Sequence, residues 1–325
     1  LVHHAELGYD VVGFVDDDPG KAKTRMWGIP VLGSLKDVPW LVKSHLIDEL
    51  VVAMPSASPD AIRRLVGICR DLEVRLKILP AEGSVLRGDE SMVRLRDVQI
   101  EDLLAREPID LELPLLAADI EGQTVLITGA AGSIGSELSR QVALNKPKRL
   151  ILFDQAETDL FYIDLELRDK HPDVRIIPIV GDILNRDRLG EVFSKWKPSR
   201  VFHAAAYKHV PMMETNPSEA VRNNVIGTWQ VAATAGKAGA EKFVLISTDK
   251  AVNPENVMGM TKRAAELAIL SCADLYPKTA FTAVRFGNVL GSQGSVIPIF
   301  KRQIADGGPV TVTSKDVTRY FMTIP

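Results

Sequence analysis

A hydroxyl, a carboxylate and two amines lie within one short stretch of the chain, Ile246 to Ala264. Thr248, Asp249 and Lys250 directly follow an apolar run, and Lys262 stands further along. A hydroxyl can hydrogen-bond a substrate oxygen, whereas a carboxylate and an amine can donate or take protons. Because oxidation of an alcohol requires only one base, these residues predict acid–base chemistry that goes beyond a simple oxidation.

A glycine-rich turn precedes this stretch, between an apolar segment expected to be a strand, Val125–Thr128, and one expected to be a helix, Ser136–Leu144. In such a setting the first glycine permits a tight turn, and the second lets backbone amides approach a pyrophosphate. The third lets the helix pack closely on the strand, and the helix dipole favours the phosphates. The residues predicted to bind a dinucleotide cofactor here are Gly129, Gly132, Ser133, Ile134 and Gly135.

An acidic residue stands where the ribose of that cofactor is expected. Asp154 ends the next predicted strand, Leu150–Phe153. A carboxylate there accepts hydrogen bonds from the adenosine ribose diol and repels a 2′-phosphate. The sequence therefore favours NAD, with NADP as the alternative.

Two further strand ends carry candidate cofactor contacts. Asp182 and Ile183 follow the predicted strand Ile176–Val180 and are placed to contact the adenine ring, although a helix cap is the structural alternative for Asp182. Small residues follow the predicted strand Arg200–His203, where the backbone of the cofactor can pass closely. These small residues are Ala204, Ala205 and Ala206.

Strands and helices alternate over much of the chain, which predicts an α/β protein with parallel sheets. From about Glu121 to residue 325 we expect a Rossmann-type doubly wound parallel sheet that also includes strands at Lys242–Ile246 and Phe281–Arg285. Residues 81–120 are predicted to be a connector with one short helix near Ile100–Ala105.

Residues 1–80 predict a smaller, incomplete α/β domain with a small parallel sheet, without the strand and glycine turn that normally open such a unit. Its expected elements are strands at Val11–Val15, Leu50–Met54 and Val74–Leu79 and a helix from about Asp60 to Leu72. The acidic run Asp16–Asp18 is interpreted as a solvated turn at a strand end rather than a metal or ribose site.

Composition excludes several classes of protein. The 325 residues are 46% hydrophobic and 25% charged, as in ordinary soluble proteins, and suffice for two domains. The net charge of −3 gives no case for nucleic acid or for an anionic membrane surface. Cys69 and Cys272 lie far apart and are interpreted as core residues of a reduced, cytosolic protein. No metal site is predicted, and no apolar run reaches the roughly 20 residues that span a bilayer.

Five motifs together resemble one family: T-G-A-A-G-S-I-G, H-A-A-A-Y-K-H-V-P, S-T-D-K, M-G-M-T-K and R-F-G-N-V-L-G-S-Q-G-S-V. This family comprises the NAD(P)-dependent nucleotide-sugar 4,6-dehydratases of bacterial polysaccharide and glycan synthesis, within the extended short-chain dehydrogenase/reductases. The resemblance covers roughly Ile120 to Pro325. The first hundred residues resemble the cytosolic domain of the larger, membrane-anchored members, without its opening strand and the transmembrane helices before it.

The resemblance implies a 4,6-dehydration of UDP-N-acetylglucosamine to a UDP-4-keto-6-deoxy sugar, by oxidation at carbon 4, loss of water and hydride return to carbon 6. It also implies a homo-oligomer. The parent protein would lie at the cytoplasmic face of the bacterial inner membrane, and we expect both ends of this chain to be cut from it.

The same resemblance assigns roles to residues. Thr248 would bind the carbon 4 oxygen, Lys250 would take the carbon 5 proton and Asp249 would protonate the leaving hydroxyl. Lys262 would hold the nicotinamide ribose, and Asn224 is placed near the cofactor by its motif.

Met258 departs from the usual pattern, because relatives in the wider superfamily place a tyrosine four residues before the lysine. A thioether cannot take the carbon 4 hydroxyl proton, so another group must do so: Asp249, Thr248 through water, or a group of the substrate. For Met258 itself, core packing and a substrate contact are both open. The residues expected on the substrate side are Lys208, Asn288, Ser295, Val296 and Arg319.

Two other functions compete with dehydration. One is a nucleotide-sugar 4-epimerase or reductase on the same scaffold, although those reactions rely on the missing tyrosine and have no use for the adjacent Asp249 and Lys250. The other is a catalytically silent module that binds NAD or a nucleotide sugar.

Overall fold

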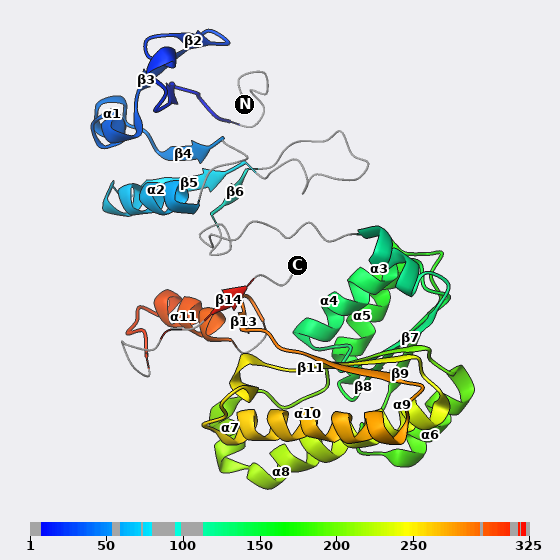
Figure 1. The fold of residues 1–325 in the computed structure, drawn as a ribbon. Helices are drawn as coiled ribbons and strands as arrows, with labels where there is room; N and C mark the ends of the chain where they lie inside the picture. Colours follow the sequence, from blue (N-terminus) through cyan, green and yellow to red (C-terminus); the bar gives the residue numbers. More distant parts are fainter. Residues whose placement is uncertain are drawn as a thin grey trace. The chain divides into compact units, whose positions relative to one another are not determined.

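The computed structural model describes residues 8–53, 59–72, 74–79, 95–98, 113–292, 295–312, 318 and 320–322. The chain divides into two compact units, Leu1–Pro108 and Ile109–Pro325 (Figure 1). Of the helices in these ranges, none combines the length and the apolar character needed to cross a membrane. The predicted helix near Ile100–Ala105 lies outside the described residues.

The first unit contains two small sheets instead of the single parallel sheet that we expected. β4 (Glu49–Val52) pairs in parallel with β5 (Arg75–Ile78), and β6 (Arg96–Asp97) adds to β5 in the opposite direction. The second sheet has the order β1-β3-β2. The helices of this unit are α1 (Val38–His45) and α2 (Pro59–Leu72), and Ile62 and Leu65 of α2 pack on the β4–β5 pair.

The second sheet forms because of a hairpin that the sequence pattern did not reveal. β2 (Arg25–Met26) and β3 (Ile29–Gly33) are antiparallel and are joined by Trp27 and Gly28, whose φ angles are 51° and 82°. Positive φ at both positions is what a tight two-residue hairpin turn requires. β1 (Phe14–Val15) then pairs in parallel with β3, and is shorter than the predicted strand Val11–Val15.

The acidic run after β1 is a turn whose carboxylates are used locally. Asp16 forms an ion pair with Lys21 at 2.7 Å, Asp17 accepts a hydrogen bond from the backbone N–H of Leu35, and Asp18 accepts one from Gly20. Hydrogen bonding to Lys21 is the main cause that lowers the pKa of Asp16. These contacts are those of the solvated turn that the sequence predicts.

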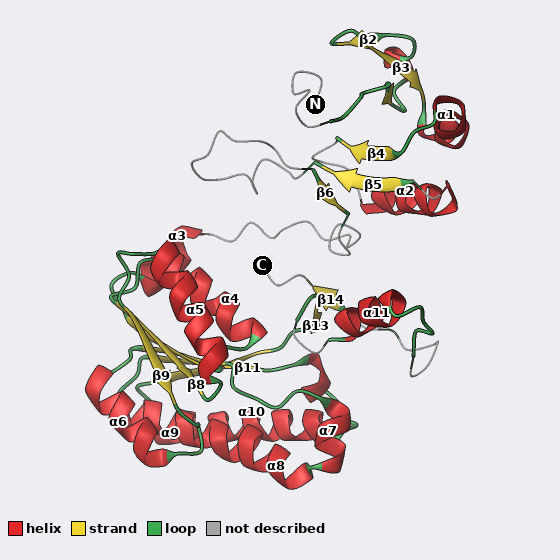
Figure 2. Ribbon diagram, turned by 180° about the vertical axis from the view of Figure 1, so that it is seen from behind, coloured by secondary structure: helices red, strands yellow, loops and turns green. Residues whose placement is uncertain are grey.

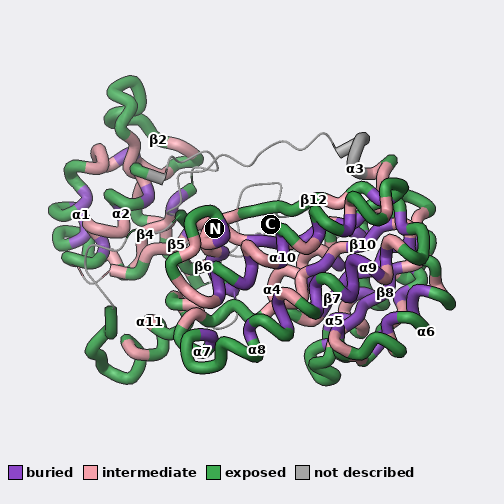
Figure 3. The backbone as a smooth tube through the Cα atoms, turned by 60° about the horizontal axis from the view of Figure 1, so that its bottom comes forward, coloured by how far each residue is buried: buried purple, intermediate pink, exposed green. Residues whose placement is uncertain are grey.

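The second unit is built on the predicted doubly wound sheet, with six parallel strands in the order β12-β11-β10-β7-β8-β9. The strands are β7 (Thr124–Thr128), β8 (Arg149–Asp154), β9 (Ile176–Val180), β10 (Arg200–His203), β11 (Lys242–Ile246) and β12 (Ala280–Val284). β7 is buried along its whole length, and β8 is buried except at its two ends, as expected for central strands covered on both faces (Figure 3).

Helices cover both faces of this sheet (Figures 1 and 2). One face carries α4 (Ser133–Leu144) and α5 (Glu157–Lys170), and the other carries α6 (Arg186–Trp196), α9 (Thr228–Ala238) and α10 (Val257–Leu275). Two short helices, α7 (Val210–Thr215) and α8 (Pro217–Val221), and a π-helical turn at Arg222–Gly227 lead into α9. The chain order reverses between β7 and β10, and ligands of such sheets bind beyond the carboxyl ends of the strands at this point.

One helix, α3 (Leu113–Ile120), lies within the segment that we expected to be a connector. Ile120 is buried against the core on the α4–α5 side of the sheet. Asp119 forms ion pairs with Arg200 of β10 and Lys242 of β11, at 3.1 and 2.6 Å. The end of this segment is therefore part of the second unit, because both its apolar and its charged side chains are engaged there.

Beyond β12 the chain forms a short parallel pair and one further helix. β13 (Asn288–Val289) pairs with β14 (Phe321–Met322), and α11 (Val296–Ala305) lies between them in sequence. These elements bring residues from the end of the chain towards the carboxyl edge of the sheet.

Candidate active site

Two hollows open at the carboxyl ends of the strands in the second unit. The first, which we call the glycine hollow, has a volume of about 260 Å³ and is lined by Gly129, Gly132 and Asp154 among others. The second, the lysine pocket, has a volume of about 690 Å³ and is lined by Lys208, Lys250 and Lys262 among others. They adjoin, because Ala204, Ala206 and Tyr207 line both hollows.

The glycine turn has the geometry that close backbone approach requires. Gly129 has a φ of 68°, and a Cβ on it would come within 2.5 Å of the backbone nitrogen of Ala205. A Cβ on Gly135 would overlap the carbonyl oxygen of Gly129. α4 begins at Ser133, three residues earlier than predicted, with Gly132 as its N-cap, so the helix N-terminus follows directly from the turn.

Asp154 lies beside this turn. Its two carboxylate oxygens accept hydrogen bonds from the backbone N–H groups of Ala131 and Ala156, each at 2.9 Å. Asp182 accepts a hydrogen bond from the N–H of Leu184 at 2.8 Å within its own turn, whereas the N-cap of α6 is Asn185, so Asp182 is not the helix cap that the sequence offered as an alternative. Asp154, Asp182 and the buried Ile183 all line the glycine hollow, as do the alanines that follow β10.

The side chains of Thr248, Asp249 and Lys250, shortly after β11, are linked through the Asp249 carboxylate. Thr248 donates a hydrogen bond to Oδ1 of Asp249 at 2.9 Å, and Nζ of Lys250 donates to the same oxygen at 3.1 Å. Lys250 also donates to Oδ1 of Asn288 at 2.9 Å. A short 3₁₀ turn at Asp249–Ala251, capped by the Thr248 side chain, imposes this arrangement. Thr248 and Lys250 line the lysine pocket, and Asp249 supports both from behind.

The Asp249 side chain carries no proton that it could donate in the resting protein. Burial raises its pKa, but hydrogen bonds from Lys250 and Thr248 outweigh burial, and the pKa of Asp249 ends below its ordinary value. The carboxyl group is therefore ionised at neutral pH. An acid role for Asp249 requires that it first receive a proton.

Lys262 is buried at the inner end of the lysine pocket, with 5% of its surface exposed. Its Nζ donates a hydrogen bond to the carbonyl oxygen of Ile246 at 2.6 Å. Burial lowers the pKa of Lys262 to about 8, and the negative charge of Glu266 only partly offsets this effect. Burial also lowers the pKa of Lys208.

Met258 has the core-packing role that the sequence left open, and its substrate contact stays a prediction. It packs in a buried cluster with Met213 and Ala220, and it also lines the lysine pocket.

Asn224 was expected to contact the cofactor, but it lines neither the glycine hollow nor the lysine pocket. Its buried amide accepts from the N–H of Tyr207 and donates to the carbonyl of Tyr207 and to the hydroxyl of Thr261. It fixes the loop after β10 to α10.

The residues expected on the substrate side divide into two groups. Lys208, Asn288, Ser295 and Val296 line the lysine pocket. Within the described part of the chain, the buried hydroxyl of Ser295, the N-cap of α11, has no hydrogen-bond partner. Arg319 lies outside the described residues.

Sequence reasoning missed two features of the site. Tyr207 lies at the junction of both hollows, and the aromatic residue in H-A-A-A-Y was a usable signal for it. Glu266 is a buried carboxylate bonded to Ser247 and Arg285, and its position one helical turn after Lys262 was the available signal. Among the described residues, no group of three or more His, Cys, Asp or Glu side chains could hold a metal ion.

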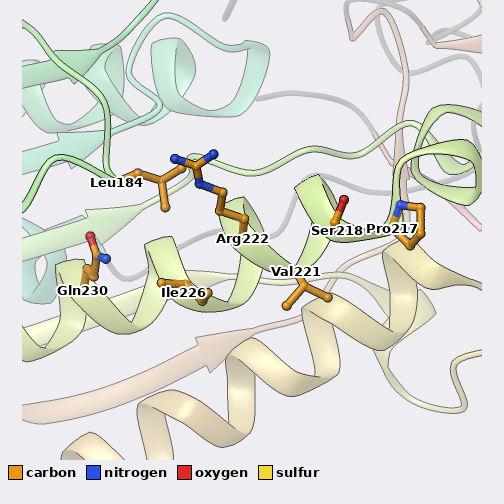
Figure 4. A pocket seen from close by; sticks show the side chains of 7 residues that line it. All are labelled: Leu184, Pro217, Ser218, Val221, Arg222, Ile226 and Gln230. Atoms are coloured by element: carbon orange, nitrogen blue, oxygen red, sulfur yellow. The ribbon is translucent and has the colours of Figure 1, made fainter.

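A third hollow of about 630 Å³ lies apart from these residues (Figure 4). It runs along α8, the π-helical turn and α9, and the side chain of Leu184 lies across from the helices. Its wall is mostly apolar and contains no residue of the Thr248–Lys250 turn, so it adds nothing to the chemistry. Its lining residues are Leu184, Pro217, Ser218, Val221, Arg222, Ile226 and Gln230.

Three known proteins are informative relatives. The chain is 47% identical over 313 residues to the capsular polysaccharide biosynthesis protein CapD of Staphylococcus aureus, covering 96% of this chain and 52% of that protein. It therefore spans about half the length of this relative. It is 33% identical over 207 residues to a UDP-N-acetylglucosamine 4,6-dehydratase (inverting) of Campylobacter jejuni, covering 62% of this chain and 60% of that enzyme. A UDP-glucose 4-epimerase of Rickettsia canadensis is 36% identical over 208 residues, and the match covers 62% of this chain and 59% of that enzyme.

Solved structures show the same fold. The X-ray structure of Pen from Bacillus thuringiensis is 40% identical, with a TM-score of 0.59, and the match covers 63% of this chain and 64% of that one. The structure of MoeE5 in complex with UDP-glucose and NAD is 26% identical, with a TM-score of 0.51, and the match covers 62% of this chain and 68% of that one.

Two family models match separate parts of the chain. Residues 1–80 match a model described as a CoA-binding domain. Residues 125–325 match the model of the polysaccharide biosynthesis proteins, which is more than half of the chain. With the doubly wound sheet, the glycine turn and the relatives above, this match shows that the chain belongs to the polysaccharide biosynthesis protein family.

Proposed function

We propose that this protein is a nucleotide-sugar 4,6-dehydratase that converts UDP-N-acetylglucosamine to a UDP-4-keto-6-deoxy sugar. The observation that carries the proposal is the contact of Thr248, Asp249 and Lys250 beside Lys262, in a pocket that adjoins the glycine hollow. A hydroxyl, a carboxylate and an amine in mutual contact can manage the three proton movements of a dehydration. Relatives named as a UDP-N-acetylglucosamine dehydratase and as a UDP-glucose epimerase support a reaction on a nucleotide sugar.

The cofactor is NAD. The residues of the glycine hollow fit a dinucleotide, because Gly129 and Gly135 leave no room for a side chain and the N-terminus of α4, where a pyrophosphate is favoured, follows directly from the turn. Asp154 is at the position that selects an unphosphorylated ribose. The related structure of MoeE5 holds NAD together with UDP-glucose. When bound, NAD would supply the hydride chemistry of the reaction, an oxidation at carbon 4 of the sugar and a reduction at carbon 6.

Oxidation at carbon 4 requires a group that takes the hydroxyl proton, and Met258 cannot. We assign this step to the pair of Thr248 and Asp249. Thr248 lines the pocket and already donates to Asp249 at 2.9 Å, and Asp249 is ionised because its pKa is lowered. As Thr248 takes the proton from the carbon 4 oxygen, its own proton passes to the carboxylate.

Elimination uses the proton that Asp249 has gained. Lys250, once it has lost its ammonium proton to solvent, removes the proton from carbon 5, which the carbon 4 ketone has made acidic. Because Asp249 does not itself line the pocket, it returns its proton through the Thr248 hydroxyl to the carbon 6 hydroxyl, which leaves as water. When hydride returns to carbon 6, Lys250 gives its proton back to carbon 5. Once Lys250 regains its ammonium proton from solvent, both residues end in their starting states, and the sugar has lost one molecule of water.

Lys262 and Asn288 position the reacting groups. Lys262 is close enough to the end of β11 to hold the nicotinamide ribose there, and its buried position explains its lowered pKa. Asn288 accepts a hydrogen bond from Lys250 and so orients the amine towards the pocket. Ser295, with a buried hydroxyl that has no partner in the described structure, is available to the sugar nucleotide.

The proposal is tested by incubating the full-length protein and NAD with UDP-N-acetylglucosamine and measuring the product by mass spectrometry. A product lighter by one water is expected. Lys250→Ala should abolish the product and leave NAD binding intact, whereas Lys237→Ala, an exposed lysine of α9, should change neither. A product of unchanged mass with altered stereochemistry at carbon 4 would instead identify an epimerase. Binding of NAD without any product would identify the silent module.

A further inference from the structure

A fully bonded carboxylate lies one helical turn beyond Lys262. Glu266 has 4% of its surface exposed, and Ser247 donates a hydrogen bond to its Oε1 at 2.6 Å. Arg285 donates to both oxygens, with Nε at 2.8 Å from Oε1 and Nη2 at 2.6 Å from Oε2. Arg263 donates to Oε2 at 3.0 Å. A buried charge with this many donors keeps its ionised form at little net cost.

Glu266 and Lys262 form hydrogen bonds to two consecutive residues, Ile246 and Ser247, at the end of β11. Residues four apart in a helix project from one face, so both side chains leave α10 in the same direction. Lys262 donates to the backbone carbonyl of Ile246, and Glu266 accepts from the hydroxyl of Ser247. Thr248 comes next in the chain. This face of α10 therefore holds the two residues that immediately precede the reacting turn.

The same carboxylate joins the neighbouring strand. Arg285 directly follows β12, and the backbone there also contacts the reacting turn. The N–H of Ser247 donates to the carbonyl of Val284 at 2.7 Å, and the N–H of Asp249 donates to that of Phe286 at 3.0 Å. The ends of β11 and β12 thus meet at Glu266.

We propose that Glu266 is a positioning residue for the reaction: by holding Ser247 and Arg285 together it sets the place of the Thr248–Lys250 turn relative to α10. The inference rests on the proposed function, since it assigns the turn its chemistry. Lys262 contributes to the same end through Ile246, but a lysine that contacts the cofactor has to share its donors with it, whereas both oxygens of Glu266 are bonded to Ser247, Arg263 and Arg285.

Electrostatics agree with this role. Burial raises the pKa of Glu266, but hydrogen bonds from Arg285, Ser247 and Arg263 outweigh it and lower the pKa to about 2. The carboxylate is therefore ionised over the whole working range of pH. Its negative charge also raises the pKa of Lys262 against the effect of burial.

The test compares Glu266→Gln with a matched control in the full chain. Glutamine keeps the shape but turns one acceptor into a donor that faces Arg285. The control is Glu166→Gln, which breaks the pair formed by Arg140 and Glu166 between α4 and α5. That pair has the same two-pronged geometry, with both bonds at 2.8 Å. Ser247→Ala is a milder second variant that leaves Glu266 and Arg285 paired.

For Glu266→Gln we expect kcat to fall by about ten- to a hundred-fold, with KM changed by less than about three-fold, because the loss is one of alignment. Ser247→Ala should show a smaller fall of the same kind, and Glu166→Gln should keep the wild-type kcat. In hydrogen exchange, amides of residues 247–252 should exchange faster in Glu266→Gln and Ser247→Ala but not in Glu166→Gln. If both variants at the turn keep wild-type kcat and exchange, Glu266 has no positioning role. Hydrogen exchange can be measured even when the wild-type protein forms no dehydrated product. A failure of the proposed function can therefore be told apart from a failure of the positioning role of Glu266.

Discussion

Replacing Lys262 by methionine should remove activity while leaving the protein about as stable at neutral pH. Methionine fills the same buried space without a charge. The ammonium group is costly to bury, and its loss favours the folded state. Against this, the carbonyl of Ile246 loses a hydrogen bond from a charged donor, worth about 1.5–3 kcal/mol. The two effects have opposite signs and similar size.

The pH dependence separates these two effects. Burial lowers the pKa of Lys262 from 10.5 to about 8. Because a shift of one pKa unit corresponds to about 1.4 kcal/mol, this shift changes the free energy of unfolding by about 3 kcal/mol. The unfolded chain binds the proton more tightly than the folded one. The free-energy penalty of burying the Lys262 ammonium group is therefore fully present below pH 8, is relieved as the pH rises to 10.5, and is absent above that.

Urea unfolding at several values from pH 7 to 10.5 measures this dependence. Relative to Lys262→Met, the wild-type protein should gain about 3 kcal/mol of stability between pH 8 and pH 10.5. Lys237→Met, an exposed substitution in α9, should run parallel to the wild type throughout. A constant separation between wild type and Lys262→Met over this range would refute the reasoning, because it would mean that the amine is not desolvated.

Three further predictions concern the cofactor side and the core. Gly135→Ala should destabilise the protein by about 1–3 kcal/mol and abolish NAD binding, since its Cβ would overlap Gly129; unchanged thermal unfolding and NAD titration would contradict this. Asp154→Ala should weaken NAD binding by at least about ten-fold and NADP binding much less, as measured by calorimetry; an unchanged preference would show that Asp154 does not contact the ribose. Burial lowers the pKa of His203 to about 3. Because the unfolded chain then binds a proton that the folded chain does not, the free energy of unfolding should fall by about 1.4 kcal/mol for each pH unit below about 6.5. Urea unfolding between pH 6.5 and 4.5 measures this slope, which His203→Gln should flatten.

The carboxyl-edge residues were predictable because chain position alone brings them together. In a parallel sheet every strand ends at the same edge, so Gly129 after β7, Asp154 at the end of β8 and Thr248 after β11 must lie near one another. The contact between Asp249 and Lys250 also follows from their adjacency. The lowered pKa of Asp249 does not, because it depends on the balance between burial and two hydrogen bonds.

Features that depend on pairing at a distance were not predictable in the same way. α3 was missed because its one charged residue, Asp119, pairs with Arg200 and Lys242, far along the chain. Asn224 was placed at the cofactor by its motif, whereas its amide is used by Tyr207 and Thr261. The hairpin at Trp27 and Gly28 was hidden because tryptophan is an unusual residue at positive φ.

Met258 has a consequence for attempts to rebuild an ordinary dehydrogenase from this scaffold. One side of its thioether packs on Met213 and Ala220, and the other faces the pocket. A tyrosine introduced there would have to place a rigid ring where a flexible chain now follows the contours of α7 and α8. We therefore expect a tyrosine here to require compensating changes at Met213 or Ala220, which belong to the same buried cluster as Met258. The catalytic repertoire of the pocket is thus coupled to the packing of α7, α8 and α10.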